Sequence, residues 1–251
     1  MAVINASPES FFSKSFVPPE SILSTVHRFA DAGADIIDVG ARSTAPDSPV
    51  LPVQTERERV TETLKQIEGS GIPISLDTMH PEVLNAALRH DIAAINDIHG
   101  LSSPEYARIA ADSGLPVISM ASKNDPGDVR SVEDTMSALS LVISRAEKYG
   151  IEELILDPAI GKWIPDWEPE DDWELCRHFS EFLQFNRPLL AAVSRKTFIG
   201  DLTGRSPDDR LAGTLAVTCT LMDKGASLIR AHDVRETADI IHVHQKLNPR
   251  I

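Results

Sequence analysis

The stretch LLAAVSRKTFIG, from Leu189 to Gly200, contains the pattern that decides the fold. Its first five residues are apolar and fit a short strand that is buried on both faces. The strand ends abruptly at Ser194, Arg195 and Lys196, which places polar and cationic groups at its carboxyl end. In parallel α/β proteins ligands bind at this edge of the sheet, although charged residues also follow strands in ordinary loops. The stretch therefore predicts either an anion site or the first solvated residues after a strand.

The same succession of a short apolar run and an amphipathic segment repeats about eight times along the 251 residues. The expected strands are 2–4, 35–40, 72–76, 92–95, 116–119, 153–156, 189–193 and 226–229. Two of the expected helices end near residues 31 and 186. The other six cover about 55–68, 81–90, 104–113, 132–149, 207–224 and 234–246. Such alternation implies a parallel sheet with right-handed crossovers. Eight units in a chain of this length predict an α/β fold of the (β/α)₈ TIM-barrel type, with residues 1–251 as a single domain.

The composition excludes several classes of function. A formal net charge of −14 argues against a general nucleic-acid binder or a protein that binds anionic membranes. No apolar run approaches the roughly 18 residues of a membrane span. Cys176 and Cys219 lie far apart without CxxC spacing, which favours a reducing, cytoplasmic environment over a disulfide or zinc framework.

Polar residues follow nearly every expected strand, and in a barrel these positions meet at one mouth. They are Asn5, Asp38, Asp77, Asn96, Met120 (the one apolar member), Asp157, Ser194 with Lys196, and Arg230 with His232. Each has a structural alternative, because Asn and Asp commonly cap turns and Asp38 could pair with Arg42. The joint placement is more specific than any single residue.

The residue types at this mouth indicate the ligand. Carboxylate and amide groups suit a flat ring edged with N–H donors, and here they are Asp77, Asn96 and Asp157. Cationic donors suit a phosphate or a ring oxygen, and here they are Lys196, Arg230 and His232. Asn5 could complete the shell of Mg²⁺, which prefers oxygen ligands and keeps several waters. The residues therefore predict a base-like heterocycle that carries phosphate.

Eight segments resemble, in order and spacing, the motifs of the dihydropteroate synthase family. They are VINASPESF, GADIIDVGARSTAP, ISLDT, AINDI, LDPAIG, AVSRKTFIG, LAGTLA and IRAHDV. The resemblance covers nearly the whole chain. It implies a (β/α)₈ barrel that joins a dihydropterin-methyl diphosphate to the amine of 4-aminobenzoate and releases pyrophosphate. It also implies a homodimer, for which the apolar faces of the last two helices are the candidates.

The resemblance also implies roles for individual residues. The positions that hold the pterin ring are matched by Asp77, Asn96, Asp157 and Lys196, with Met120 as an apolar wall. Asn5 matches a magnesium-linked asparagine, and Arg230 and His232 match the residues that bind the diphosphate. Thr44 lies in the second loop over the site, while Ser194 and Thr197 edge the substrates. The implied catalytic set is Asp77, Lys196, Arg230 and His232, and Arg195 is expected to pair structurally beneath the site.

The departures from the family's motifs gather on the side of the arylamine. Ala45 stands where the family has Arg, Lys162 where it has Phe, and ASKNDPGD replaces a segment that contains His. Two interpretations remain: neutral drift with 4-aminobenzoate retained, or a different amine such as the ribosyl-phosphate arylamine of methanopterin synthesis. Alternatives of another class are a pterin-dependent methyl-transfer barrel, which needs no diphosphate site, and a non-catalytic pterin-binding barrel.

The segment DWEPEDDWEL, residues 166–175, is interpreted mainly as a helix start, where acidic residues favour the positive end of the dipole. Trp163 and Trp167 have a smaller chance of reaching the mouth, because the loops after barrel strands line the site.

Overall fold

The computed structural model describes residues 1–7, 16–42 and 51–249. Within these, the strands are β1 (Ala2–Asn5), β2 (Ile37–Gly40), β3 (Ile74–Asp77), β4 (Ala94–Asp97), β5 (Val117–Met120), β6 (Leu154–Asp157), β7 (Leu190–Ala191) and β8 (Leu228–Ile229). The α-helices are α1 (Ile22–Asp31), α2 (Val53–Ile67), α3 (Pro81–Ala87), α4 (Pro104–Ser113), α5 (Val132–Tyr149), α6 (Pro169–Arg177), α7 (Thr197–Thr203), α8 (Leu211–Asp223) and α9 (Val234–Leu247). Short 3₁₀ helices cover Pro19–Ser21, Phe179–Phe185 and Pro207–Asp209.

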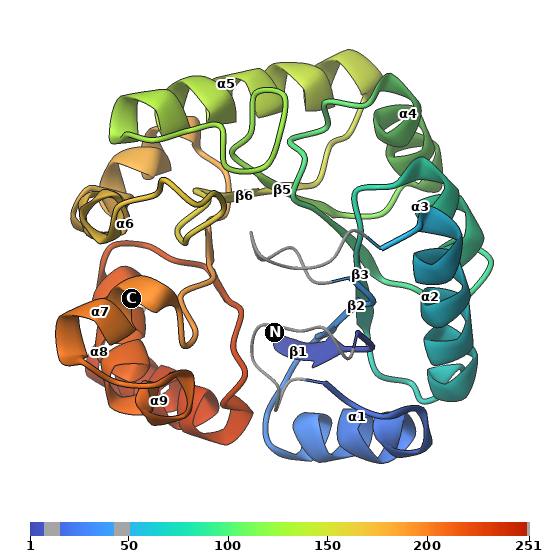
Figure 1. Cartoon of the computed structure of the whole chain (residues 1–251), viewed down its shortest axis with the longest axis horizontal. Helices are drawn as coiled ribbons and strands as arrows, with labels where there is room; N and C mark the ends of the chain where they lie inside the picture. The colour runs from blue at the N-terminus through green and yellow to red at the C-terminus, as the bar shows by residue number, and fades with distance from the viewer. Residues whose placement is uncertain (8–15, 43–50, 250–251) are drawn as a thin grey trace.

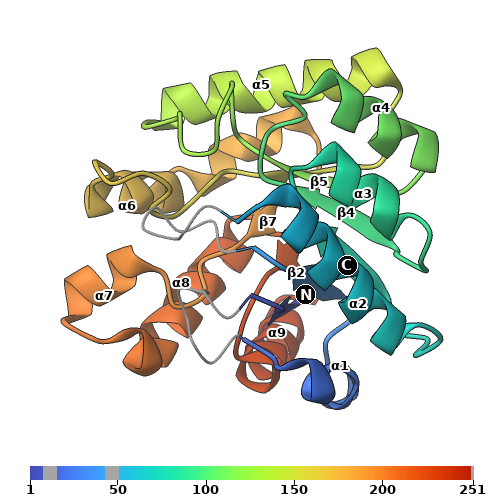
Figure 2. The same ribbon diagram turned by 45° about the vertical axis from the view of Figure 1, so that its right-hand side comes forward.

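The strands close into a ring. β1 to β6 form one parallel sheet in chain order, and β7 pairs in parallel with β8. Isolated parallel bridges join the two pieces, Leu156 with Leu189 on one side and Ala2 with Ala231 on the other. The helices surround the strands on the outside (Figure 1), and the turned view shows the same arrangement obliquely (Figure 2). The predicted (β/α)₈ barrel is confirmed.

The core has two layers, because successive side chains of a strand point to opposite faces. The larger cluster lies between the strands and the helices and includes Ile37, Leu76, Val83 and Leu156. A smaller, separate cluster contains Ile118, Leu190 and Ala192. The register pairs Asn96 with Ile118, and Ile118 with Ile155, so this small cluster and Asn96 share the inner face. Because side chains alternate between the two faces along each strand, Asp77, Met120, Asp157 and Arg230 also point to the inside of the barrel.

Some helices differ from the sequence-based expectations. The single helix expected over 207–224 is a 3₁₀ turn followed by α8, because Arg210 between them leaves the helical conformation at φ −88° and ψ 6°. The expected helix that ends near 186 is likewise α6 followed by a 3₁₀ segment. The sequence reading left out α7, since a seven-residue helix with an interior glycine has weak local signals. Tertiary packing forms it, and Phe198 and Ile199 are buried.

Ala159 is held in a conformation that favours glycine. Its φ is +64°, and its side chain is fully buried behind β6. The left-handed region costs an L-residue about 1–2 kcal/mol, while glycine gains unfolded-state entropy that offsets part of this. We therefore expect Ala159→Gly to raise the free energy of unfolding by about 0.5–1 kcal/mol. Urea denaturation measures the change, with Ala110→Gly in the regular helix α4 as a control that should lose stability. Unchanged or lower stability of Ala159→Gly would contradict the strain.

Candidate active site at the carboxyl ends of the strands

Arg230 forms the centre of the site. It follows β8, and its guanidinium donates to Asp38 from Nε at 2.7 Å and to Asp77 from Nη2 at 3.0 Å. These carboxylates belong to β2 and β3, so the arginine reaches past β1 and spans the seam where β8 meets β1. Arg230 is thus brought together with the predicted ring-binding residues.

Asp38 has a partner that the sequence analysis did not predict. Its proposed ion pair with Arg42 is wrong, because Arg42 instead donates to Glu56 at 2.8 Å while Asp38 binds Arg230. The Asp38 carboxylate is fully buried and also accepts from Nδ2 of Asn96 at 3.1 Å. Donation through Nδ2 leaves the amide oxygen of Asn96 available as an acceptor. Asp38 therefore orients two neighbouring groups of the site.

Asp77 lies beside Asn96 in the register of β3 and β4. Burial raises the pKa of its carboxyl group to about 7, with a further upward contribution from Asp38, and Arg230 opposes both. Since the ordinary value is 3.8, the native state binds this proton more tightly than the unfolded state. The resulting stability is fully present below about pH 4 and is lost as the pH rises through about 7. Asp77 thus changes charge near neutral pH.

Lys196 is the N-cap of α7 and points back to the loop after β6. Its Nζ donates to the carbonyl of Ile160 and lies 5.2 Å from the ring centroid of Trp163. Burial lowers the pKa of Lys196, and the charges of Asp157 and Asp172 oppose the shift. Asp157 is buried too, which raises its pKa, while Lys196 lowers it. The lysine therefore joins the predicted ring-binding residues on the side of β6 and β7.

His232 and Ser194 meet on the other side of the mouth. Nδ1 of His232 lies 2.9 Å from Oγ of Ser194, which also accepts from the His232 backbone amide at 3.1 Å. Burial, with Arg230 nearby, lowers the pKa of His232 to about 3. The imidazole is therefore neutral in the free protein, and the expectation of a cationic histidine is wrong for this state. A neutral imidazole can still donate one hydrogen bond to an anion.

Arg195 has the structural role that was expected. Its guanidinium binds the Asp233 carboxylate with two hydrogen bonds, at 2.8 and 2.6 Å, and donates to the carbonyls of Pro207 and Asp208. Its φ of +58° and its backbone hydrogen bond to Thr214 turn the chain sharply after β7. This turn directs Lys196, the next residue, toward the loop after β6.

The remaining predicted residues occupy several positions around the mouth. Asn5 ends β1, Thr197 is the first residue of α7, and Met120 is buried at the end of β5. Thr44 lies outside the described residues. In the described part of the chain, no group of three His, Cys, Asp or Glu residues has the geometry of a metal site.

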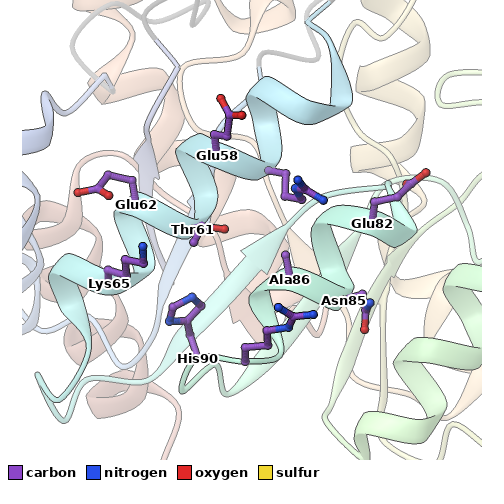
Figure 3. Close-up of a pocket in the computed structure, with 10 residues that line it drawn as sticks. Glu58, Thr61, Glu62, Lys65, Glu82, Asn85, Ala86 and His90 are labelled. Carbon is purple, nitrogen blue, oxygen red and sulfur yellow. The ribbon is translucent and has the colours of Figure 1, made fainter.

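A groove on the outer surface has a different character. It lies between α2 and α3, has a volume of about 620 Å³, and is drawn in Figure 3. Its lining mixes basic and acidic side chains, among them Arg57, Lys65, Arg89, Glu58 and Glu62. None of the predicted site residues lines it.

Comparisons with known proteins identify the family to which the chain is similar. A family model described as pterin binding enzyme matches residues 1–232. The dihydropteroate synthase of Escherichia coli (strain K12) is 34% identical over 256 residues, covering 97% of this chain and 89% of that protein. The solved dihydropteroate synthase of Xanthomonas albilineans with 4-aminobenzoic acid has a TM-score of 0.89 at 33% identity, covering 100% of this chain and 93% of that one. The enzyme of Coxiella burnetii with pteroic acid has a TM-score of 0.88 at 28% identity, covering 99% and 92%.

The family model and the closed α/β barrel together place the chain in the pterin-binding class of enzymes. The match over most of the chain is specific enough to go one step further. The chain belongs to the dihydropteroate synthase family. The resemblance inferred from the sequence motifs is confirmed.

Two further residues lie at the site: Trp163, for which the sequence indicated only a smaller chance of reaching the mouth, and Asp172, which it assigned to a helix start. Trp163 is half-buried, donates from Nε1 to the carbonyl of Ala159 at 2.9 Å and faces Lys196. Asp172 is almost fully buried in α6 and accepts from the Gly161 amide at 2.6 Å. The only sequence signal for Asp172 was an acidic run that equally fits a helix start. Trp167, the other tryptophan considered, is buried within the core.

Proposed function

We propose that this chain is a dihydropteroate synthase that condenses 7,8-dihydropterin-6-ylmethyl diphosphate with 4-aminobenzoate. The observation that carries the proposal is the linked group of Asp38, Asp77, Asn96 and Arg230, together with Lys196 at the N-cap of α7, whose buried ammonium group interacts with the charge of Asp157. In the reaction the bond between the methylene carbon and the diphosphate oxygen breaks, and its electron pair leaves with pyrophosphate. A C–N bond forms to the amine, which loses a proton.

In this proposal the ring-binding residues orient the pterin ring for the reaction. Asp77, Asp157 and the free oxygen of Asn96 accept hydrogen bonds from the ring, and Lys196 donates to a ring acceptor. Positive charge develops on the pterin as the diphosphate departs, and the buried carboxylates stabilise it. Arg230, which already lies against Asp77, donates to the leaving group together with the neutral His232. Thr197 and Ser194 lie beside the position of the amine.

The donor set fits a magnesium ion that is held mainly by the diphosphate. Asn5 would offer one amide oxygen to such an ion, whereas Asp38 and Asp77 are both engaged by Arg230. Mg²⁺ keeps several waters and commonly binds through one or two protein oxygens and substrate phosphates. When bound, the ion supplies charge neutralisation on the leaving diphosphate.

The comparisons favour 4-aminobenzoate over a ribosyl-phosphate arylamine, because one solved relative is in complex with 4-aminobenzoic acid and another with pteroic acid. A methyl-transfer barrel is less favoured, since Arg230 and His232 would have no diphosphate to bind. We also propose a homodimer through α8 and α9 and a cytoplasmic location. Among the described residues, no helix is long and apolar enough to cross a membrane.

An assay of a panel of arylamines with the same pterin diphosphate tests the proposal. We expect turnover with 4-aminobenzoate and release of one pyrophosphate for each dihydropteroate formed. Faster turnover with the ribosyl-phosphate arylamine would overturn the choice of amine. Binding of pterin diphosphate without turnover of any amine would overturn the synthase assignment.

The pKa of Asp77 predicts a pH dependence for pterin binding. The ionised carboxylate accepts two ring hydrogen bonds, whereas the protonated form has lost part of that capacity. With a pKa of about 7 in the free protein, the affinity for pterin should fall about tenfold from pH 7.5 to pH 6. Calorimetric titration at several pH values measures this. Asp77→Asn should bind more weakly but with a flatter profile, and equal slopes for both proteins would contradict the assignment to Asp77.

A further inference from the structure

Asp172 is a buried carboxylate among solvent-exposed acids. It lies in the first turn of α6 with only 1% of its surface exposed. The neighbouring acids have the surface role expected of a helix start, since Asp171 accepts from the Glu168 amide at 3.3 Å and Glu170 pairs with Arg177. Burial raises the pKa of Asp172 to about 6, and the charge of Lys196 opposes this shift. A carboxylate in such a position requires a specific partner.

One such partner is the peptide group between Ile160 and Gly161. The amide of Gly161 donates to Oδ1 of Asp172 at 2.6 Å. The carbonyl of Ile160, at the other end of the same peptide group, accepts from Nζ of Lys196. Because a peptide group is planar, the hydrogen bond that holds its amide also fixes the direction of its carbonyl. Asp172 and Lys196 are therefore coupled without touching.

The surroundings of Gly161 make this coupling tight. Its φ is +135°, which suits glycine, and a Cβ at this position would lie 2.6 Å from Nζ of Lys196. The ring of Trp163 faces the same ammonium group at 5.2 Å. The lysine thus packs directly on the peptide, and a rotation of that peptide would displace it.

We propose that Asp172 is a positioning residue for Lys196, acting through the Ile160–Gly161 peptide to hold the ammonium group in place for the pterin. The inference rests on the proposed function for the identity of the ligand. Asp172 itself does not touch the substrate in this role. Its loss should weaken pterin binding while leaving the amine site unchanged.

The test compares Asp172→Ala and Asp172→Asn with the control Asp171→Ala, using the full chain and 7,8-dihydropterin-6-ylmethyl diphosphate. Calorimetry gives the pterin Kd, steady-state assays give KM for 4-aminobenzoate, and thermal melting monitors folding. We expect Asp172→Ala to raise the pterin Kd about tenfold, as loss of a charged hydrogen bond does, with KM for the amine unchanged. Asp172→Asn should stay within about threefold, because its amide oxygen still accepts from Gly161. Asp171→Ala should bind pterin as the unchanged chain does.

A pterin Kd unchanged in Asp172→Ala, or raised equally in Asp171→Ala, would overturn the proposal. If Asp172→Ala does not fold, Asp172→Leu replaces it as a variant with the same branching at Cγ but without an acceptor. Equal affinities of Asp172→Asn and Asp172→Leu would then overturn it. An unchanged chain that binds pterin but makes no dihydropteroate overturns only the proposed function, since the Kd comparison still decides the role of Asp172. A chain that binds no pterin overturns both.

Discussion

Substitution of Lys196 by alanine is expected to weaken pterin binding about a hundredfold, which corresponds to the loss of one or two hydrogen bonds from a charged donor. The ammonium group faces the loop after β6, near Asp157 and Asp172, and no other described lysine is a member of this group. Without it, the ring loses a donor and the two carboxylates lose their counter-charge. Isothermal titration with pterin diphosphate measures the affinity, and turnover should fall with it.

The control for this variant is Lys162→Ala in the same loop region, because Lys162 is exposed. It should leave the pterin affinity within about twofold, as surface substitutions generally do. Lys196→Gln separates the loss of charge from the loss of packing, since its amide can still donate. An effect of Lys196→Ala on amine affinity alone, with pterin affinity retained, would contradict the assignment.

Removal of Arg230 is expected to have the largest effect on stability. Arg230→Ala leaves Asp38 and Asp77 close together without their shared cation, and Asp38 is fully buried. Removing one partner of a buried ion pair typically lowers the free energy of unfolding by about 3–5 kcal/mol. The variant should also lose nearly all synthase activity, because the leaving diphosphate loses its donor. Urea denaturation at pH 7.5 measures the first effect and pyrophosphate release the second.

The pH dependence of the lost stability provides a control for Arg230→Ala. Protonation relieves the repulsion between the two carboxylates, so the destabilisation relative to the unchanged chain should shrink at pH 5.5. The double variant Arg230→Ala with Asp38→Asn should recover part of the lost stability for the same reason. A loss of stability that is independent of pH and is not reduced by Asp38→Asn would indicate a packing defect instead.

Much of the fold could be predicted from the sequence because each unit has strong local signals. The helices α4 and α5 have the predicted boundaries, since Pro104 begins the first and glycines follow both. The α7 helix could not be predicted in the same way, because its stability comes from burial of Phe198 and Ile199 rather than from propensity. The break at Arg210 depends on side-chain hydrogen bonds to the carbonyls of Arg195 and Arg205, which no local pattern shows.

The site was predictable where its position follows from strand ends, and less so where it depends on pairing. Alternation along each strand was sufficient to bring Asp77, Asn96 and Asp157 to one mouth. The pairing of Asp38 with Arg230, while Arg42 pairs with Glu56, is a long-range property of the closed ring. The neutrality of His232 follows from burial beside Arg230, and burial cannot be read from residue identity alone.

The position of Arg230 also bears on the order in which the chain acquires function. Its contact with Asp38 joins residues 192 positions apart in sequence, across the seam where the end of the barrel meets β1 through the Ala2–Ala231 bridge and the hydrogen bond from the Met1 amino group to the carbonyl of Ile229. Contacts of such high sequence separation require the closure of long loops, which makes their formation slow. The early strands can therefore pair before the arginine arrives, but their carboxylates have no counter-charge until then. Competence to bind pterin should accordingly appear with the last step of folding, and refolding followed by ligand fluorescence should lag behind the recovery of helix.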